Sequence, residues 1–120
     1  MAIDDVAVVN EDDLPFEELT PGIAVARAVT ARALTELGGG WTHISDDSAR
    51  LEWHLTYDEV LFVHRGRVVI TAEGRDIEAH EGQAVIIRKG TTVTYQGTAG
   101  TVLFYTLFPA NWATMSQGTT

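Results

Sequence analysis

Apolar runs of five to eight residues recur along the chain from Trp41 onward, separated by short turn signals. Polar or glycine-containing turns fall at 45–48, 65–67 and 73–75. Val, Ile, Thr, Tyr and Phe dominate the runs, which is typical of β-strands. Short strands at this spacing predict an all-β sandwich or barrel. The predicted strands are 49–56, 57–64, 68–73, 76–82, 83–90, 92–97 and 101–108.

The N-terminal part of the chain lacks this regular punctuation. Its first 21 residues are acidic, contain two prolines and predict an extended arm. The alanine-rich segment 24–37 lacks a clean helical stripe, so we expect strands interrupted near Thr30–Ala31. The three glycines at 38–40 predict a hinge or bulge. The expected organisation is an arm (1–21), one domain (22–112) and a tail with a short helical turn (113–120).

The strand 50–56 has one polar and one apolar face, because successive side chains point to opposite sides. The polar face holds Glu52, His54 and Thr56, and the apolar face holds Leu51, Trp53 and Leu55. Both faces cannot lie in solvent. We therefore expect Glu52 and His54 to face a pocket inside a barrel, and Trp53 to face a partner sheet or subunit.

The order Glu52-x-His54-x4-Glu59-x6-Gly66 resembles the first sequence motif of the cupin family. In that family two histidines, a glutamate and a glycine form a strand–turn–strand that supplies three metal ligands. The resemblance implies Glu52, His54 and Glu59 as a tentative set for one divalent ion (Fe, Mn, Ni or Zn), since carboxylate and imidazole suit such metals.

The second cupin motif is similar to "GQAVIIRKGTTVTYQG", in which Gly82 and Gly90 have the family's spacing. Val93 stands where the family places its fourth ligand, a histidine. Arg88 and Gly97 also replace the usual proline and asparagine. The ligand set implied by the resemblance is therefore incomplete.

Two segments together resemble the cupin domain of the EutQ family: "WHLTYDEVLFVHRG" (53–66) and "FYTLFPANW" (104–112). The resemblance spans roughly 38–112. It implies a cupin-type β-barrel, or jelly roll, of two packed antiparallel sheets that forms a homodimer. An acetate-kinase-type role is attached to EutQ itself. The sequence has no Walker-type phosphate loop to support it, and no nucleotide cofactor is expected.

Several residues could carry chemistry in such a pocket. His54 could be a metal ligand, a general base, or a core histidine bonded to Glu59. Glu59 is expected to face inward, where a buried carboxylate must find a donor or a cation, or its pKa rises. Tyr95 shares a face with Val93 and is either a proton donor or an aromatic filler. Further pocket candidates are His43, Tyr57, and one of Phe104 and Tyr105.

The overall charge narrows the classes of partner. The 120 residues carry a net charge of −9, have a sequence pI of about 4.6 and include no cysteine. An acidic chain repels phosphate backbones, so neither nucleic acid nor an anionic membrane surface is an expected partner. The N-terminus lacks the pattern of a signal peptide, and a cytoplasmic protein is the default expectation.

These observations favour a small-molecule enzyme of the lyase or isomerase type. His54 and Glu59, helped by Glu52 and Tyr95, would hold one metal or perform acid–base chemistry directly. Isomerisation, dehydration or cyclisation of a carbonyl compound suits this equipment. The alternative is a non-catalytic, EutQ-like binding or scaffold domain of a metabolic pathway.

Overall fold

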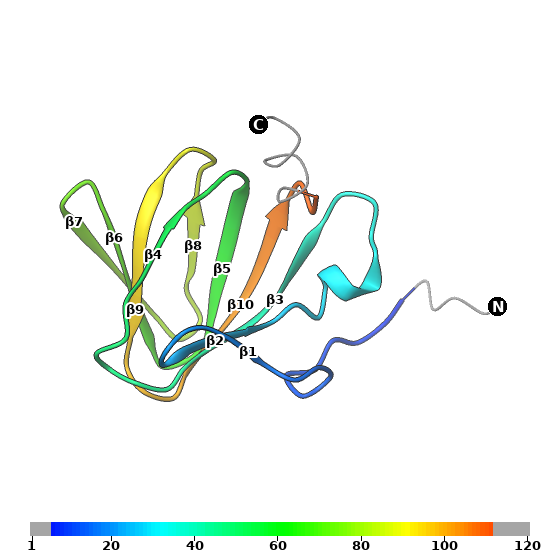
Figure 1. Ribbon diagram of the computed structural model, residues 1–120, viewed down its shortest axis with the longest axis horizontal. Coiled ribbons are helices and arrows are strands. Elements are labelled where there is room, and N and C mark those ends of the chain that lie inside the picture. Colours follow the sequence, from blue (N-terminus) through cyan, green and yellow to red (C-terminus); the bar gives the residue numbers. More distant parts are fainter. Residues whose placement is uncertain (1–5, 112–120) are drawn as a thin grey trace.

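Two antiparallel sheets make up nearly all the regular structure of the computed structural model, which describes residues 6–111. The six-stranded sheet has the order β1-β2-β3-β10-β5-β8, and the four-stranded sheet has the order β4-β9-β6-β7 (Figure 1). The predicted all-β, two-sheet fold is confirmed. The elements are β1 (Glu17–Thr20), β2 (Ile23–Ala26), a 3-10 turn η1 (Thr30–Arg32), β3 (Gly38–Ile44), β4 (Leu51–His54), β5 (Asp58–Arg65), β6 (Arg67–Ala72), β7 (Arg75–His80), β8 (Ala84–Ile87), β9 (Thr92–Gly97) and β10 (Thr101–Phe108).

The segments before Trp41 follow the prediction in part. The predicted interruption near Thr30 is correct, because η1 separates β2 from β3. The three glycines do not form a hinge, since they are the first residues of β3. Strand β1 lies inside the predicted arm, and the predicted tail 113–120 lies outside the described residues. Within 6–111, no helix has the length and apolarity that a membrane span needs.

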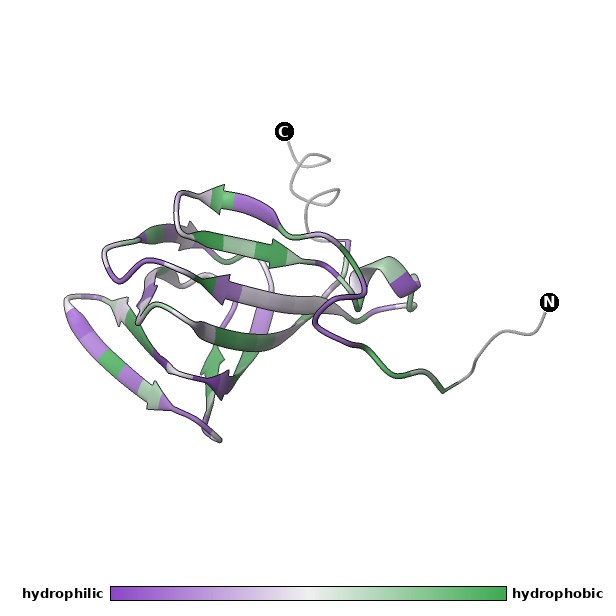
Figure 2. Ribbon diagram, turned by 90° about the horizontal axis from the view of Figure 1, so that it is seen from below, coloured by the Kyte–Doolittle hydropathy of each residue, from purple (hydrophilic) through white to green (hydrophobic). Residues whose placement is uncertain are grey.

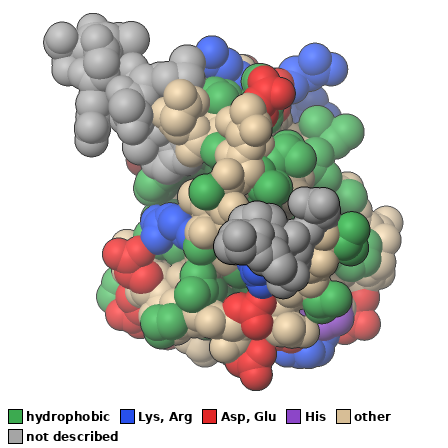
Figure 3. All heavy atoms as spheres, turned by 90° about the vertical axis from the view of Figure 1, so that its right-hand side faces the viewer, with side chains coloured by type: hydrophobic (Ala, Val, Ile, Leu, Met, Phe, Trp, Pro, Cys, Tyr) green, Lys and Arg blue, Asp and Glu red, His purple; other side chains and the backbone are tan. Residues whose placement is uncertain are grey.

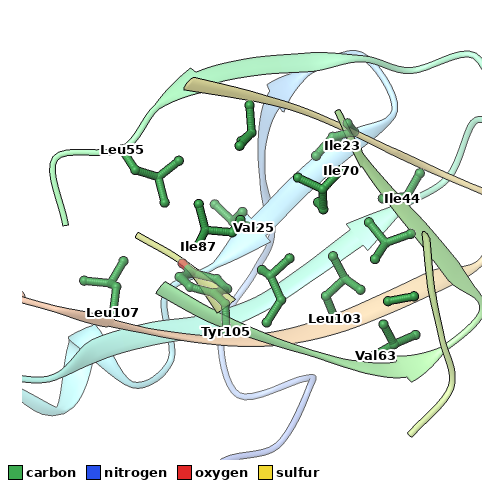
Figure 4. Packing of buried hydrophobic residues seen from close by; sticks show 14 of the residues in the cluster. Ile23, Val25, Ile44, Leu55, Val63, Ile70, Ile87, Leu103, Tyr105 and Leu107 are labelled. Atoms are coloured by element: carbon green, nitrogen blue, oxygen red, sulfur yellow. The ribbon is translucent and has the colours of Figure 1, made fainter. Parts of the chain in front are cut away.

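The core lies between the two sheets and receives side chains from both. Apolar and polar residues alternate along the strands, which is visible in Figure 2. This alternation buries one face of each sheet, and the removal of apolar surface from water stabilises the pair. Figure 4 shows how aliphatic side chains surround Tyr105. The most deeply buried apolar side chains are Ile23, Ile44, Leu55, Val63, Val68, Ile70, Val93 and Leu103.

The N-terminal arm is tied to the outer face of the six-stranded sheet through His43. Phe16 stacks on the His43 ring with centroids 3.8 Å apart, and His43 Nε2 lies 3.0 Å from Glu11 Oε2. The same Glu11 oxygen accepts a hydrogen bond from Arg65 Nη2 at 3.0 Å. The prediction that His43 reaches the pocket is therefore wrong. Alternation along β3 turns Thr42 and Ile44 inward and His43 outward.

Acidic and basic side chains are interspersed on the side of the molecule toward which the arm extends (Figure 3). Glu11 belongs to this mixed surface. Its partial burial raises the pKa of the carboxyl, but the His43 hydrogen bond and the Arg65 charge outweigh that effect, and the pKa is lowered overall. The arm is therefore held by a carboxylate that stays ionised in mildly acidic solution.

Glycines at the start of β3 allow its neighbours to approach closely. Gly39 has φ +143°, and a Cβ there would overlap the carbonyl oxygen of Tyr105 on β10. A Cβ on Gly40 would overlap the carbonyl oxygen of Ala26 on β2. Side chains at these two positions would push β3 away from both neighbouring strands.

We predict that Gly39→Ala lowers the free energy of unfolding by about 3 kcal/mol, because the new Cβ meets backbone that cannot move cheaply. The matched control is Gly82→Ala, which also has a positive φ (86°) but has open space around it. That control should cost only about 1 kcal/mol, from backbone strain alone. Urea unfolding of both variants measures the difference, and equal losses would contradict the close approach at β3.

Candidate active site

A cavity of about 100 Å³ lies between the sheets and has mostly apolar walls. Residues from both sheets line it, including Ile23 and Leu103 from the six-stranded sheet and Leu51 from β4. A cavity with apolar walls and a few convergent polar groups is the usual form of a small-molecule site. Its polar lining residues are Arg27, Thr30, Thr42, Tyr57, Glu59, Tyr95 and Tyr105.

Glu59 is the acidic residue of this cavity. Buried and exposed residues alternate along β5, and Glu59 falls on the same inward face as Leu61 and Val63. Its side chain is only 6% exposed. Its carboxylate Oε1 accepts a hydrogen bond of 2.8 Å from the hydroxyl of Tyr95. Because Tyr95 lies on β9 of the opposite sheet, this bond crosses the core and joins the two sheets.

Burial sets the protonation of this pair. Loss of hydration raises the pKa of Glu59 to about 7, although the Tyr95 hydrogen bond acts in the opposite direction. Burial also raises the pKa of Tyr95, and the charge and hydrogen bond of Glu59 raise it further. The phenol therefore stays protonated, while the carboxyl exchanges its proton near neutral pH. Such a pKa is well placed for general acid–base catalysis.

Two more phenols and one guanidinium complete the polar lining. Tyr57, which precedes β5, and Tyr105 on β10 are both buried. Burial raises the pKa of Tyr105 to about 12, and the charge of Arg27 opposes this rise. The Arg27 side chain lines the cavity but is 44% exposed and also pairs with Glu17. The cavity therefore reaches the protein surface beside Arg27.

The two faces of β4 are reversed relative to the prediction. Glu52 and His54 point outward and are exposed, and His54 Nδ1 lies 2.8 Å from the Thr92 hydroxyl. Leu51 and Trp53 line the cavity instead. The reason is hydrophobic: the apolar face gains more from leaving water than a face with a charged carboxylate.

The reversal also changes which surface could form the interface of the predicted homodimer. The homodimer itself stays a prediction. The face that was expected to meet a partner sheet or a subunit packs against the six-stranded sheet in the core, so it is not available to a subunit. Exposed apolar side chains lie elsewhere, on β5, β8 and β10 of the six-stranded sheet; they are Val60, Phe62, Ile86 and Phe108.

The metal set suggested by the motif is not brought together. Glu52 and His54 lie on the outer face of β4, whereas Glu59 lies inside the cavity. Among residues 6–111 no group of three or more His, Cys, Asp or Glu side chains converges as metal ligands. The groups around Glu59 are phenols, which do not supply the histidine ligands of the family motif. The nominated residues therefore do not fit a metal in this cavity.

The remaining predicted pocket residues divide cleanly. Tyr57, Tyr95 and Tyr105 line the cavity. Phe104 points to the outer face, where its ring packs edge-on against Trp41 at 4.9 Å between centroids.

Sequence reasoning missed Trp53, Arg27 and Thr42 as cavity residues. Alternation held the signal for two of them. Thr42 lies two residues before the apolar Ile44, and Arg27 lies two residues after Val25, so each shares the inward face of its neighbour.

This arrangement, two antiparallel sheets around a small cavity, is that of a cupin. An RmlC-like cupin from Shewanella frigidimarina has the same fold, with a TM-score of 0.68 over 89% of this chain and 92% of that chain at 12% identity. The chain also matches the family described as ethanolamine utilisation protein EutQ over residues 5–114. It therefore belongs to the EutQ family.

Individual relatives are similar to it over different lengths. The Escherichia coli protein named acetate kinase EutQ is 30% identical over 69 residues, which are 58% of this chain and 30% of that protein. The solved structure of the Clostridium difficile EutQ protein has a TM-score of 0.70 at 25% identity and covers 88% of this chain and 83% of that chain. The chain spans only 29% to 50% of the length of the curated relatives it matches.

We predict that Glu59→Gln stabilises the protein in a pH-dependent way. The ordinary pKa of 4.5 is raised to about 7 in the fold, so the native state holds a proton that the unfolded chain has already released. The free energy of unfolding of the unmodified protein should therefore fall as pH rises from about 4.5 to about 7. Glutamine keeps an acceptor for Tyr95 but cannot ionise.

The stabilisation by Glu59→Gln should be close to zero at pH 4, below the unfolded pKa, and should reach the order of 3 kcal/mol at pH 8. Urea unfolding at both pH values measures it. The control is Glu52→Gln on the exposed face of β4, whose effect should not depend on pH in this way. A Glu59→Gln effect of equal size at both pH values would contradict the raised pKa.

Proposed function

We propose that the cavity catalyses proton transfer on a small carbonyl compound, with Glu59 as the general acid–base. The observation that carries this proposal is a carboxyl group 6% exposed in an apolar cavity, hydrogen-bonded to Tyr95 and titrating near neutral pH. A base with a pKa near the working pH combines a useful ionised fraction with sufficient basicity. A buried carboxyl with a strongly raised pKa is also a common mark of a functional site.

The reaction begins when the ionised Glu59 removes a proton from the carbon next to the carbonyl. The C–H electron pair forms a carbon–carbon double bond, and the carbonyl π pair moves onto oxygen to give an enolate. Glu59, now protonated, returns its proton to the same carbon or to a neighbouring atom. Isomerisation, dehydration and cyclisation of carbonyl compounds all share this first step. Tyr95 holds the carboxylate in place through its hydrogen bond.

The walls of the cavity support this chemistry. Because the lining is mostly apolar, little water competes for the base or for the enolate. The volume of about 100 Å³ suits a substrate of few heavy atoms. The proposal differs from the sequence-based hypothesis, because the outward-facing His54 and Glu52 have no part in it and Glu59, held by Tyr95, is itself the base.

The name acetate kinase, which the curated relatives carry, is not extended to this chain. The chain spans half or less of those relatives. Arg27 is also the only basic side chain among the described residues that line the cavity, and phosphoryl transfer relies on several positive charges. The second candidate is the non-catalytic binding domain, which is supported by the absence of converging metal ligands within residues 6–111.

We predict that the protein exchanges the α-hydrogens of small ketones with solvent deuterium, which proton NMR in D2O measures with acetone or hydroxyacetone as probes. The rate should rise with pH through about 7, because the base must be ionised. Glu59→Gln should lower the rate by about 100-fold or more. Tyr95→Phe should shift the pH midpoint upward, because the lost hydrogen bond held the pKa of Glu59 down.

The matched control is His54→Ala on the outer face of β4, which should leave the exchange rate unchanged. Saturable binding of the ketones without exchange would instead favour the non-catalytic binding domain. Exchange that survives Glu59→Gln would remove Glu59 as the base.

A further inference from the structure

The cavity holds a second polar group that proton transfer by Glu59 does not use. Tyr57, Tyr105 and Arg27 all line it, and both phenols are buried. Within residues 6–111 the Tyr105 hydroxyl makes no hydrogen bond to another protein group, and it is not among the fully buried unpaired polar atoms, so it is accessible in the cavity. A phenol donor that is accessible in a cavity is available to a ligand.

The sheet register explains how an arginine from β2 reaches this group. Ala26, the last residue of β2, pairs with Trp41, so Arg27 lies beside Gly40 on β3. Gly40 in turn pairs with Tyr105 on β10. Arg27 and Tyr105 therefore lie on either side of Gly40, and their side chains both line the cavity.

The charge of Arg27 is felt at this end of the cavity. Burial raises the pKa of Tyr57 and of Tyr105, the charge of Glu59 raises both further, and the charge of Arg27 opposes these rises. The pKa of Glu59 is set by burial and by Tyr95. The two phenols therefore lie within range of both the Glu59 carboxylate and the Arg27 cation.

We propose that Tyr57 and Tyr105, backed by Arg27, form an oxyanion site that makes this cavity selective for small uncharged aldehydes and ketones. The inference rests on the proposed function and specifies its substrate class. The substrate oxygen accepts hydrogen bonds from the two phenols and gains negative charge as Glu59 removes the α-proton. Donors placed in a low-dielectric cavity stabilise such a charge far more than water does.

Glu17 tunes this site from outside the cavity. Its carboxylate pairs with Nη1 of Arg27 at the surface, where the Glu17 side chain is 68% exposed. A guanidinium has five N–H donors, so one ion pair leaves others for the cavity. The pair nevertheless offsets part of the positive charge that an oxyanion would feel.

Phenol is a suitable probe, because its phenolate places a negative oxygen on a planar carbon framework, as an enolate does. The test measures phenol binding to the full chain and the ionisation of bound phenol by ultraviolet difference spectra. We expect bound phenol to ionise at a lower pH than free phenol. Arg27→Met should weaken phenolate binding about tenfold, and Glu17→Gln should strengthen it.

The control is Arg50→Met. Arg50 is also exposed, and its Nη1 donates hydrogen bonds to the backbone carbonyls of Asp47 and Ala49. It should leave phenol binding unchanged. Tyr105→Phe should lower the ketone exchange rate at saturation by about 100-fold with little change in KM, because the interaction forms mainly in the transition state.

The outcomes separate the two proposals. Phenolate binding that depends on Arg27 in a protein without ketone exchange supports the oxyanion site and contradicts Glu59 as an acid–base. Ketone exchange that is insensitive to Arg27→Met and Tyr105→Phe overturns the oxyanion site and keeps the role of Glu59. Glu59→Gln should lower exchange by about 100-fold or more while phenol binding persists, which separates the role of the base from that of the oxyanion site.

Discussion

The burial of Glu59 is the constraint on which the site depends. A carboxylate in an apolar cavity loses its hydration, and the fold offers it one strong compensation, the hydroxyl of Tyr95. That hydroxyl comes from the opposite sheet, so the bond also fixes how β5 and β9 face each other. The remaining cost raises the pKa of Glu59 toward neutrality, and it is this cost that creates a usable base. Stability is thus given up at the position where we propose that proton transfer occurs.

The glycines of β3 determine how closely the neighbouring strands β2 and β10 approach it. A strand without side chains at Gly39 and Gly40 lets β2 and β10 approach from both sides. Arg27 and Tyr105 lie on either side of Gly40 in the sheet. The stretch for which the sequence predicts a hinge or bulge is thus a tightly packed part of the sheet.

The fold could be predicted because punctuation by glycine and polar residues marks each turn. The orientation of β4 could not, because alternation separates Glu52 and His54 from Leu51 and Trp53 without telling which set is inside. The family motif favoured the histidine, whereas the transfer of Trp53 out of water decides the matter. The inward orientation of Glu59 could be predicted, because it shares a strand face with the apolar Leu61 and Val63. The bond between Tyr95 and Glu59 spans 36 positions and two sheets, a distance that local patterns do not encode.

An enolate needs stabilisation, and a cupin with the complete set of ligands can supply it with a metal cation. In this chain, the ligand positions of the first motif do not converge, and Val93 packs into the core where the second motif has its histidine. For the proposed proton transfer, the electrophile must then come from elsewhere in the same cavity. Phenols can replace a cation only if water is excluded, because their hydrogen bonds are weak in competition with solvent. The apolar walls and the outward position of His54 are therefore connected. Because Trp53 points inward in place of His54, the cavity has the low dielectric that phenol donors need.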